Sequence, residues 1–394
     1  MTHLIPRLSA GFRAAFGREA QRFFSAPGRT EIGGNHTDHQ QGRVLAAAVD
    51  LHTCAAVAEN QDHCIRIQSQ GYPLCQVDLS DLAPNCGEFG TTTALIRGVA
   101  ARFVQLGCPV SGFDAYVEST VLPGSGLSSS AAFEVLLGTI LNALFFANRL
   151  DAKAIAMAGQ YAENVFFGKP CGLMDQMASA VGNLVTIDFF QKEDPQVLPV
   201  DVDFSAFGHA LCIIDTGADH ADLTDEYAAI TGELHNICAH FGQEVLTRIP
   251  ESEFYRAIPS LRQRCGDRAV LRAIHFYEEN ARVPQQVAAL EQGDFSRFLA
   301  LVNESGQSSW MQLQNVIPAG RTTHQEVALS LALCRQLLRG RGACRVHGGG
   351  FAGTIQAFVP LDLLADFKSQ MDDYLGAGAC HILSIRPQGG IEIQ

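Results

Sequence analysis

The chain has 394 residues, of which 47% are hydrophobic and 18% charged, a composition typical of a globular protein with two or three domains. Its net charge of −13 argues against a nucleic-acid partner. The 12 cysteines form no C-x-x-C pair, which argues against a zinc site and predicts reduced thiols. No signal-peptide core and no apolar run of ~18 residues occurs, so we expect a soluble cytoplasmic protein with no membrane partner, a monomer being favoured.

Apolar periodicity predicts helices and strands in mixed order. The first helix covers residues 4–16 and presents Leu8, Phe12 and Phe16 on one face. Further helices are expected at about 91–106, 131–150, 151–167, 172–181, 223–241, 322–338 and 361–375, with a mostly helical stretch over 245–320. Strands are expected at about 22–26, 43–60, 64–71, 112–121, 183–189, 209–217, 343–346, 353–360 and 380–387.

The strands and helices do not alternate regularly, which favours an α+β fold over a doubly wound sheet. The first strand is expected to break at Pro27-Gly28. The polar stretch 191–208 contains two prolines and interrupts the periodic pattern, so it is the expected domain boundary.

The segment PGSGLSSSAAFEV, residues 123–135, has the composition of a phosphate-binding loop. Its glycines allow a tight turn close to a ligand, and its serines lead into a helix. The free N–H groups at a helix start suit a phosphate, and a serine hydroxyl there can reach a phosphate-bound Mg²⁺. The alternative is that Ser128, Ser129 and Ser130 only cap the helix. The Walker-type and protein-kinase signatures are absent.

The segment SAPGRTEIGGNHTDHQQG, residues 25–42, crowds polar side chains into a turn-rich stretch between apolar strands. Such loops commonly carry function. Two histidines and one aspartate within four residues could hold a metal, but no helical spacing supports that interpretation. A hydrogen-bonding cluster for a polyhydroxylated ligand fits better. Its candidate side chains are Arg29, Glu31, Asn35, His36, Asp38 and His39.

Asp175 lies among Leu173, Met174 and Met177 in the apolar segment 162–182. A buried carboxylate needs a partner, so Asp175 is either a functional group or a structural, capping aspartate.

A glycine cluster, VHGGGFAGTIQAFVP, contains a formal G-x-G-x-x-G. The residues that follow alternate like a strand, whereas a dinucleotide site needs a helix there. We expect instead a backbone loop that packs close to a ligand or to another loop.

Together and in this order, these segments resemble the GHMP family of small-molecule kinases and, within it, the galactokinases. PGR-x-x-x-x-G-x-H-T-D in 27–38 is similar to the galactokinase signature, and G-x-G-L-S-S-S-A in 124–131 is similar to the phosphate-binding motif. CGLMDQ in 171–176 is similar to the segment that holds the catalytic aspartate, and GGGFAG in 348–353 is similar to the third family motif.

The resemblance implies ATP-dependent phosphorylation of α-D-galactose at its C1 hydroxyl, with ATP and Mg²⁺ as cofactors and a small-molecule sugar as partner. It implies a two-domain GHMP-kinase-like fold with the active site in the cleft between the domains. An N-terminal α+β domain is expected over 1–200 and a ferredoxin-like C-terminal domain over 201–394. The last strand, about 380–394, is expected to pack back on the N-terminal domain.

The resemblance also implies roles for single residues. Asp175 and Arg29 would be catalytic, with Asp175 acting either as general base or as a group that orients the hydroxyl while Arg29 stabilises charge. Ser130 and Glu163 would hold Mg²⁺. The sugar would contact Asn35 and His36 near C6, Asp38 at C3 and C4, and Gly172, Asp175 and Tyr227. The nucleotide would contact Pro123, Gly124, Ser125, Gly126, Leu127, Ser128, Ser129, Ser130, Ala131, Gly349 and Gly350.

Three positions depart from the family pattern. Glu31 stands where the family usually has Asn, Asn35 where it usually has Glu, and Ala352 where it usually has Gly. A glutamate at position 35 would accept a hydrogen bond from a C6 hydroxyl and would repel a C6 carboxylate by about 4 kcal/mol. Asn35 is therefore expected to weaken galactose binding and to tolerate galacturonate, which is the alternative substrate. A silent sugar sensor is the alternative of another class, but Arg29, Asp175 and Ser130 are all present.

Overall fold

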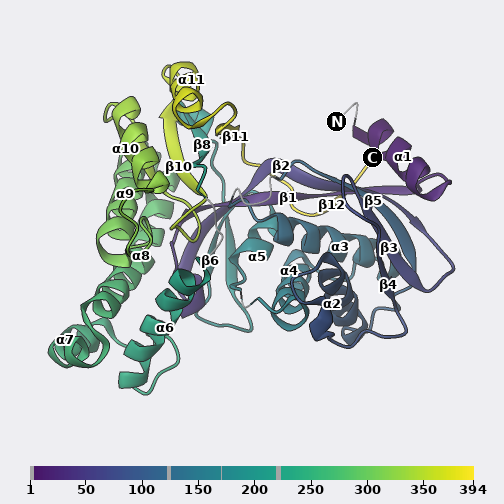
Figure 1. The fold of residues 1–394 in the computed structure, drawn as a ribbon, viewed down its shortest axis with the longest axis horizontal. Helices are drawn as coiled ribbons and strands as arrows, with labels where there is room; N and C mark the ends of the chain where they lie inside the picture. The colour runs from purple at the N-terminus through teal and green to yellow at the C-terminus, as the bar shows by residue number, and fades with distance from the viewer. Residues whose placement is uncertain (1–3, 122–125, 170, 219–222) are drawn as a thin grey trace.

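The structure is a computed structural model that describes residues 4–121, 126–169, 171–218 and 223–394 (Figure 1). The predicted nucleotide contacts Pro123, Gly124 and Ser125 lie outside the described residues.

The α-helices are α1 (Leu4–Phe16), α2 (Thr92–Gln105), α3 (Ser129–Phe145), α4 (Ala152–Tyr161), α5 (Met174–Val181), α6 (Thr224–His240), α7 (Glu251–Cys265), α8 (Asp267–Glu291), α9 (Phe295–Ser308), α10 (Glu326–Leu338) and α11 (Leu364–Leu375). The strands are β1 (Arg22–Gly33), β2 (Arg43–Glu59), β3 (Cys64–Ser69), β4 (Cys75–Asp78), β5 (Phe113–Ser119), β6 (Leu184–Asp188), β7 (Gln196–Val200), β8 (His209–Asp215), β9 (Ala343–Val346), β10 (Thr354–Pro360), β11 (Cys380–Leu383) and β12 (Ile391–Ile393).

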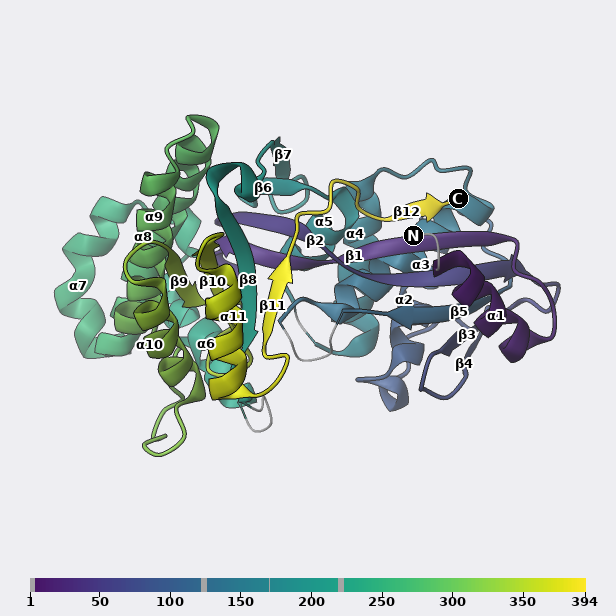
Figure 2. The same ribbon diagram turned by 90° about the horizontal axis from the view of Figure 1, so that it is seen from above.

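The larger sheet has the order β12-β1-β2-β5-β3-β4, and β6 pairs with both β2 and β7. Successive side chains of β2 point to opposite faces of this sheet. Ala55 and Val57 join the core formed with α2 to α5, whereas Cys54, Ala56 and Ala58 join the small core formed with α1. The long strands β1 and β2 cross the molecule toward the helices α8 and α9, as the view from above shows (Figure 2).

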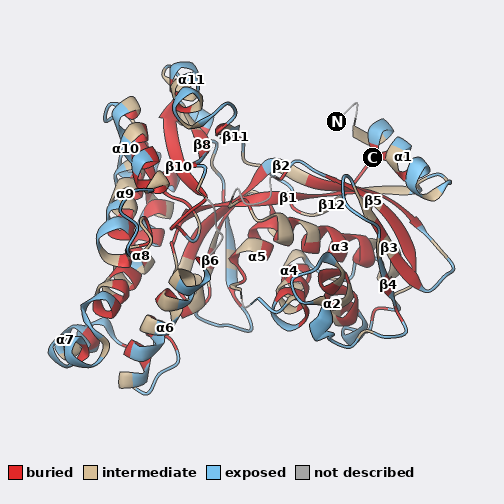
Figure 3. Ribbon diagram, viewed as in Figure 1, coloured by how far each residue is buried: buried red, intermediate tan, exposed pale blue. Residues whose placement is uncertain are grey.

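The smaller sheet has the order β11-β8-β10-β9 and is antiparallel throughout its described pairs. Its strand β8 also alternates between two cores. Cys212 and Ile214 pack with α10 and α11, whereas Leu211 and Ile213 pack with α9. The second of these cores also takes in Leu45 and other residues of β2, so it joins the two sheets. The strands are accordingly buried while the outer faces of the helices are exposed (Figure 3).

The first strand differs from its prediction, because β1 continues through Pro27-Gly28 to Gly33. The register shifts between Pro27 and Arg29 and again between Glu31 and Gly33. Such bulges accommodate a proline, which cannot donate to the ladder. Long-range bonds hold the irregular part: Ser179 Oγ donates to Pro27 O at 2.6 Å, and Arg29 N donates to Leu127 O at 3.0 Å. Arg29 and Glu31 therefore lie on a strand and not in the predicted loop.

The stretch 191–208 contains β7, which pairs with β6 in the larger sheet, and the domain boundary expected there stays a prediction. One other expectation needs correction. The helix expected over 151–167 is α4 followed by a π-helical turn, Ala162–Phe167. Among the described residues, no helix has both the length and the apolar character needed to cross a bilayer.

Candidate active site

A bidentate ion pair between Arg29 of β1 and Asp175 of α5 lies at the centre of the site. Arg29 Nε donates to Asp175 Oδ1 and Arg29 Nη2 donates to Asp175 Oδ2, each at 2.7 Å. The Arg29 guanidinium also donates to the carbonyl of Gly126, and Ser128 Oγ donates to Asp175 Oδ2 at 2.8 Å. Because two parallel N–H···O bonds fix both position and orientation, the pair is rigid. It joins three of the four sequence motifs.

Asp175 remains ionised in this setting. Burial alone would raise the pKa of Asp175, but the Arg29 charge and the hydrogen bonds from Arg29 and Ser128 outweigh it, so the pKa lies below its ordinary value. A carboxylate with a lowered pKa is a weak base. General-base catalysis works best with a pKa near the operating pH, so Asp175 is poorly suited to that role. The arrangement suits a fixed negative charge that accepts a hydrogen bond from a substrate hydroxyl.

Asp38 lies close to Gly172, the residue that precedes Leu173 and α5. A Cβ added at Gly172 would lie 1.8 Å from Asp38 Oδ2, so this close approach requires glycine. The amide of His39 donates to Asp38 Oδ1 at 2.9 Å. Burial and the charge of Asp175 raise the pKa of Asp38 to about 6. The Asp38 carboxylate can therefore accept further hydrogen bonds, and the hydroxyls of a sugar can donate them.

Helix α3 begins without a side-chain cap. Its N-cap residue, Ser128, adopts a left-handed φ of 56° and makes no capping hydrogen bond. Its hydroxyl instead donates a hydrogen bond to Asp175. The first N–H groups of a helix have no intrahelical partner, so here they are available to an anion. The alternative that the serines only cap the helix does not describe Ser128. Leu127 and Ala131 are fully buried, so they offer their backbone rather than their side chains.

The predicted metal ligand Glu163 lies in the π-helical turn after α4. Its Oε2 accepts from Gln176 Nε2 at 2.9 Å, and the same amide nitrogen donates to Glu134 Oε2 at 2.9 Å. Burial and the charge of Glu163 raise the pKa of Glu134 well above its ordinary value. Ser130 lies one turn before Glu134 on the same face of α3.

These groups fit a magnesium ion, since they are hard oxygen ligands and Mg²⁺ commonly takes one or two carboxylates together with substrate phosphates and waters. The buried Glu134 Oε1 has no hydrogen-bond partner, which leaves acceptor capacity beside Glu163. The described residues contain no cluster of three or more His, Cys, Asp or Glu side chains suited to a metal.

Protein side chains hold the glycine loop 348–350 through its carbonyls. His36 Nε2 lies 3.0 Å from Gly349 O, and Tyr227 Oη donates to Gly350 O at 2.8 Å. A Cβ at Gly349 would lie 2.7 Å from the Tyr227 ring, so the loop and this tyrosine are in close contact. The glycine loop therefore packs against the loop that carries His36, which is one of the two predicted alternatives, and it also contacts Tyr227 of α6.

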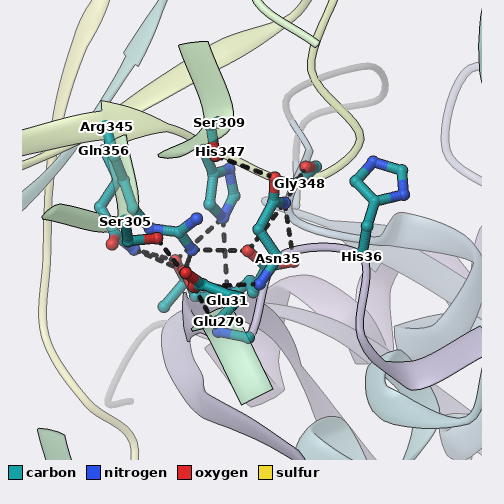
Figure 4. A network of polar contacts seen from close by, with 12 residues as sticks. Glu31, Asn35, His36, Glu279, Ser305, Ser309, Arg345, His347, Gly348 and Gln356 are labelled. Atoms are coloured by element: carbon teal, nitrogen blue, oxygen red, sulfur yellow. Dashed lines mark hydrogen bonds and ion pairs between the residues drawn. The ribbon is translucent and has the colours of Figure 1, made fainter. Parts of the chain in front are cut away.

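Asn35 differs from the expectation that it points at a sugar. It is fully buried, and its amide hydrogen-bonds Glu31, Gly348, Ser309 and Asn315 (Figure 4). A direct contact of Asn35 with C6 of a sugar stays a prediction that nothing in this geometry supports.

Comparison with known proteins identifies the family. Two family models match the sequence, the galactokinase galactose-binding signature over residues 10–59 and the GHMP kinases N terminal domain over residues 94–183. The galactokinase of Streptomyces coelicolor is 32% identical over 352 residues, which is 88% of this chain and 87% of that protein. This chain belongs to the galactokinase family. The resemblance drawn from the four motifs is confirmed.

Solved structures show the fold of the galactokinase family and its GHMP relatives. The Lactococcus lactis galactokinase complexed with galactose is similar with a TM-score of 0.83 at 23% identity, covering 99% of this chain and 100% of that one. The Methanococcus jannaschii mevalonate kinase is similar with a TM-score of 0.63 at 13% identity, covering 93% and 99% of the two chains. The predicted α+β GHMP-kinase fold is confirmed.

The galactokinase motifs did not reveal every residue of this site. Arg345, Asn315 and Glu279 contact the end of β1 and its following loop, yet none belongs to a motif. Arg345 carried a signal, because it is the one charged residue in the apolar strand ACRV and a buried charge needs a partner. Glu134 and Gln176 lie inside motifs, but only the structure shows that they orient Glu163.

Proposed function

We propose that this protein is a galactokinase that transfers the γ-phosphoryl group of ATP to the C1 hydroxyl of α-D-galactose. Membership of the galactokinase family supports the reaction. The observation that carries it at the level of the site is the Arg29–Asp175 pair, because it fixes a carboxylate and a guanidinium beside an uncapped helix N-terminus. An acceptor for a hydroxyl thus lies next to a cradle for phosphate.

Asp175 orients the C1 hydroxyl in this proposal. Its lowered pKa makes it a poor proton acceptor in the ground state, so its main contribution is a fixed hydrogen bond that directs the hydroxyl oxygen toward phosphorus. The proton leaves as the phosphoryl group arrives, and Asp175 receives it or passes it to solvent. Arg29 stabilises the negative charge on the transferred group.

Asp38 and Tyr227 are proposed to bind the sugar, with Asp38 accepting hydrogen bonds from the ring hydroxyls. The N–H groups at the start of α3, with the backbone from Gly126 to Ala131, are proposed to hold the phosphates of ATP. Ser130 and Glu163 are proposed to hold Mg²⁺, which when bound neutralises charge on the β- and γ-phosphates. Gln176 keeps the Glu163 carboxylate in place for that role.

The test is a coupled ADP-release assay with galactose, galacturonate, glucose, N-acetylgalactosamine and arabinose, applied to the native protein and to Asp175→Asn. Galactose should be the best substrate of this set, and Asp175→Asn should lower kcat by about 10²–10⁴ because the hydroxyl loses its charged acceptor. Arg29→Ala should lower kcat similarly.

Asp188→Asn is the matched control, because Asp188 is also 31% exposed and also pairs with an arginine, Arg43. This control should keep nearly full activity. An Asp175→Asn enzyme that retains more than about half of kcat would contradict the assignment.

A further inference from the structure

Residue 35 is built into the protein rather than turned toward a ligand. Asn35 is 0% exposed. Its Nδ2 donates to Gly348 O at 2.6 Å and to Glu31 Oε1 at 3.1 Å. Its Oδ1 accepts from Asn315 Nδ2 at 3.0 Å and from Ser309 Oγ at 3.3 Å (Figure 4). An amide has two donor hydrogens and one acceptor oxygen, so these contacts use both ends of the side chain.

The carboxylate that accepts a hydrogen bond from the Asn35 amide belongs to Glu31. Arg345 Nη2 donates to Glu31 Oε1 at 2.5 Å and to Glu31 O at 2.9 Å, and the Arg345 side chain is fully buried. The neighbouring Glu279 is matched in turn by Arg282. Burial lowers the pKa of the nearby His275 and His347, so both are neutral. The two acids of the cluster are therefore balanced in charge by two guanidinium groups, and a second acid beside Arg345 would add an uncompensated negative charge.

An amide at position 35 can make the bond to the glycine loop, and a carboxylate cannot. A carboxylate accepts hydrogen bonds and cannot donate to the Gly348 carbonyl, whereas the amide does so at 2.6 Å. Asn315 strengthens the link, because its Nδ2 approaches both Asn35 Oδ1 and Gly349 O. This chain has Glu31 where galactokinases usually have Asn, and Asn35 where they usually have Glu. The acid at position 31 therefore pairs with Arg345, and the amide at position 35 donates to the carbonyl of Gly348 in the glycine loop.

The second residue assigned to C6, His36, is also occupied by protein. Its Nε2 lies 3.0 Å from Gly349 O and its Nδ1 lies 3.3 Å from His39 Nε2. Burial lowers the pKa of His36, so the ring is neutral and has one N–H to donate. The carbonyl of Gly349 accepts that N–H, and Nδ1 accepts from His39. Among the described residues, the side chains of Asn35 and His36 therefore have protein partners at every donor and acceptor that could serve a C6 hydroxyl.

We propose that Asn35 is a positioning residue that ties the glycine loop 348–350 to the end of β1, and that this enzyme accepts galacto-configured sugars that lack the C6 hydroxyl. The inference rests on the proposed galactokinase function and names its substrate class. Besides D-galactose itself, the enzyme should therefore accept the 6-deoxy analogue D-fucose and also L-arabinose, which has the same ring configuration without C6.

The first experiment compares kcat/KM of the native enzyme for D-galactose, D-fucose and L-arabinose. A charge-assisted hydrogen bond to C6 would favour galactose over D-fucose by roughly 10–150-fold, whereas we expect a preference below about tenfold. A preference above about tenfold would overturn the inference while leaving the galactokinase assignment intact. Absence of turnover with galactose would overturn both.

A second experiment uses Asn35→Ala, which removes the tie to the loop without adding charge. The variant should raise KM for galactose and D-fucose by the same factor, because it loosens the loop and removes no contact to C6. A change in the galactose-to-D-fucose ratio of more than about fivefold would contradict the positioning role. Asn142→Ala is the matched control, because Asn142 is also buried and its amide bonds Leu150 through both ends. That control should lower Tm and leave both KM values unchanged.

The paired exchange Glu31→Asn with Asn35→Glu completes the test. It keeps a single acid in the cluster but removes the donor to Gly348 O, so the carboxylate at position 35 is no longer tied to the glycine loop and can turn toward the sugar. The galactose-to-D-fucose ratio should then rise by at least about tenfold. Asn35→Glu alone places two carboxylates against one guanidinium and should lower Tm more than the exchange does. A ratio that stays constant in a folded exchange variant would show that residue 35 does not lie near C6 in either form.

Discussion

Asp38 and Asp175 are two carboxylates of one site whose pKa values move in opposite directions. Asp175 has a guanidinium and a hydroxyl as partners, so its pKa is lowered in spite of burial. Asp38 has the negative charge of Asp175 nearby and a single backbone donor, so burial dominates and its pKa is raised to about 6. Carboxylates whose environments differ in this way commonly have different roles. In the proposed function, Asp175 keeps its charge for the reacting hydroxyl, and Asp38 accepts hydrogen bonds from the sugar.

The pKa of Asp38 predicts how galactose affinity depends on pH. The folded pKa of about 6 lies above the ordinary value, so the contribution of Asp38 to the stability of the free protein is present at low pH and lost as pH rises through about 6. The sugar binds best to the ionised form, because a charged acceptor makes the stronger hydrogen bond. Affinity measured by calorimetry should therefore fall about tenfold from pH 7.5 to pH 5.

Asp38→Asn isolates this effect. The variant should bind galactose more weakly at pH 7.5 and should lose most of the pH dependence between pH 5 and 7.5. An unchanged pH profile in a folded Asp38→Asn protein would assign the titration to another group.

At the scale of elements, the regular parts of the fold were predictable and the irregular parts were not. Periodicity predicted α1, β2, α2 and β5 because each buries a face of its own. The continuation of β1 past Pro27 depends on Ser179 and Leu127, which are distant in sequence. The motifs likewise located Arg29 and Asp175, but the burial of Asn35 depends on residues from 309 to 348, which no local pattern connects to it.

The π-helical turn Ala162–Phe167 carries Glu163, the proposed metal ligand. A π-helical turn adds a residue to the helical repeat and is frequent at functional sites. It directs Glu163 into the core, where Gln176 holds it. Glu163→Gln and Ser130→Ala should raise the Mg²⁺ concentration needed for half-maximal ADP release, with galactose affinity unchanged, because transfer depends on positioning and on neutralised charge.

The binding of Mn²⁺ in the presence of ATP, followed by electron paramagnetic resonance, gives a readout that does not depend on turnover. Glu118→Gln is the control, because Glu118 is another buried carboxylate, paired with Arg7 in a different part of the molecule. Identical metal titrations for Glu163→Gln, Ser130→Ala and the native enzyme would remove both residues from the metal site.

At the scale of the whole molecule, a shared core holds the site together. Leu45 of β2 and Ile213 of β8 belong to the same buried cluster, so the sheet that carries Arg29 and the sheet beside the glycine loop are packed as one body. The division into domains over 1–200 and 201–394 stays a prediction. The chain crosses any such division again near its end, because Ile385 bridges to Val49 and β12 pairs with β1.

The return of the C-terminus predicts that a very short deletion destabilises the larger sheet. Removing residues 390–394 deletes β12, whose Ile391 pairs with Ser25 and whose Ile393 is buried beside Phe23 on β1. Loss of one buried isoleucine and a few ladder hydrogen bonds amounts to about 2–5 kcal/mol, which should lower Tm by several degrees. Glu392→Ala should cost less than about 1 kcal/mol, because its pair with Arg22 is partly exposed on both sides. Thermal unfolding of both proteins decides the matter. Equal Tm values for the deletion and the native chain would mean that β1 does not need this edge strand for its stability.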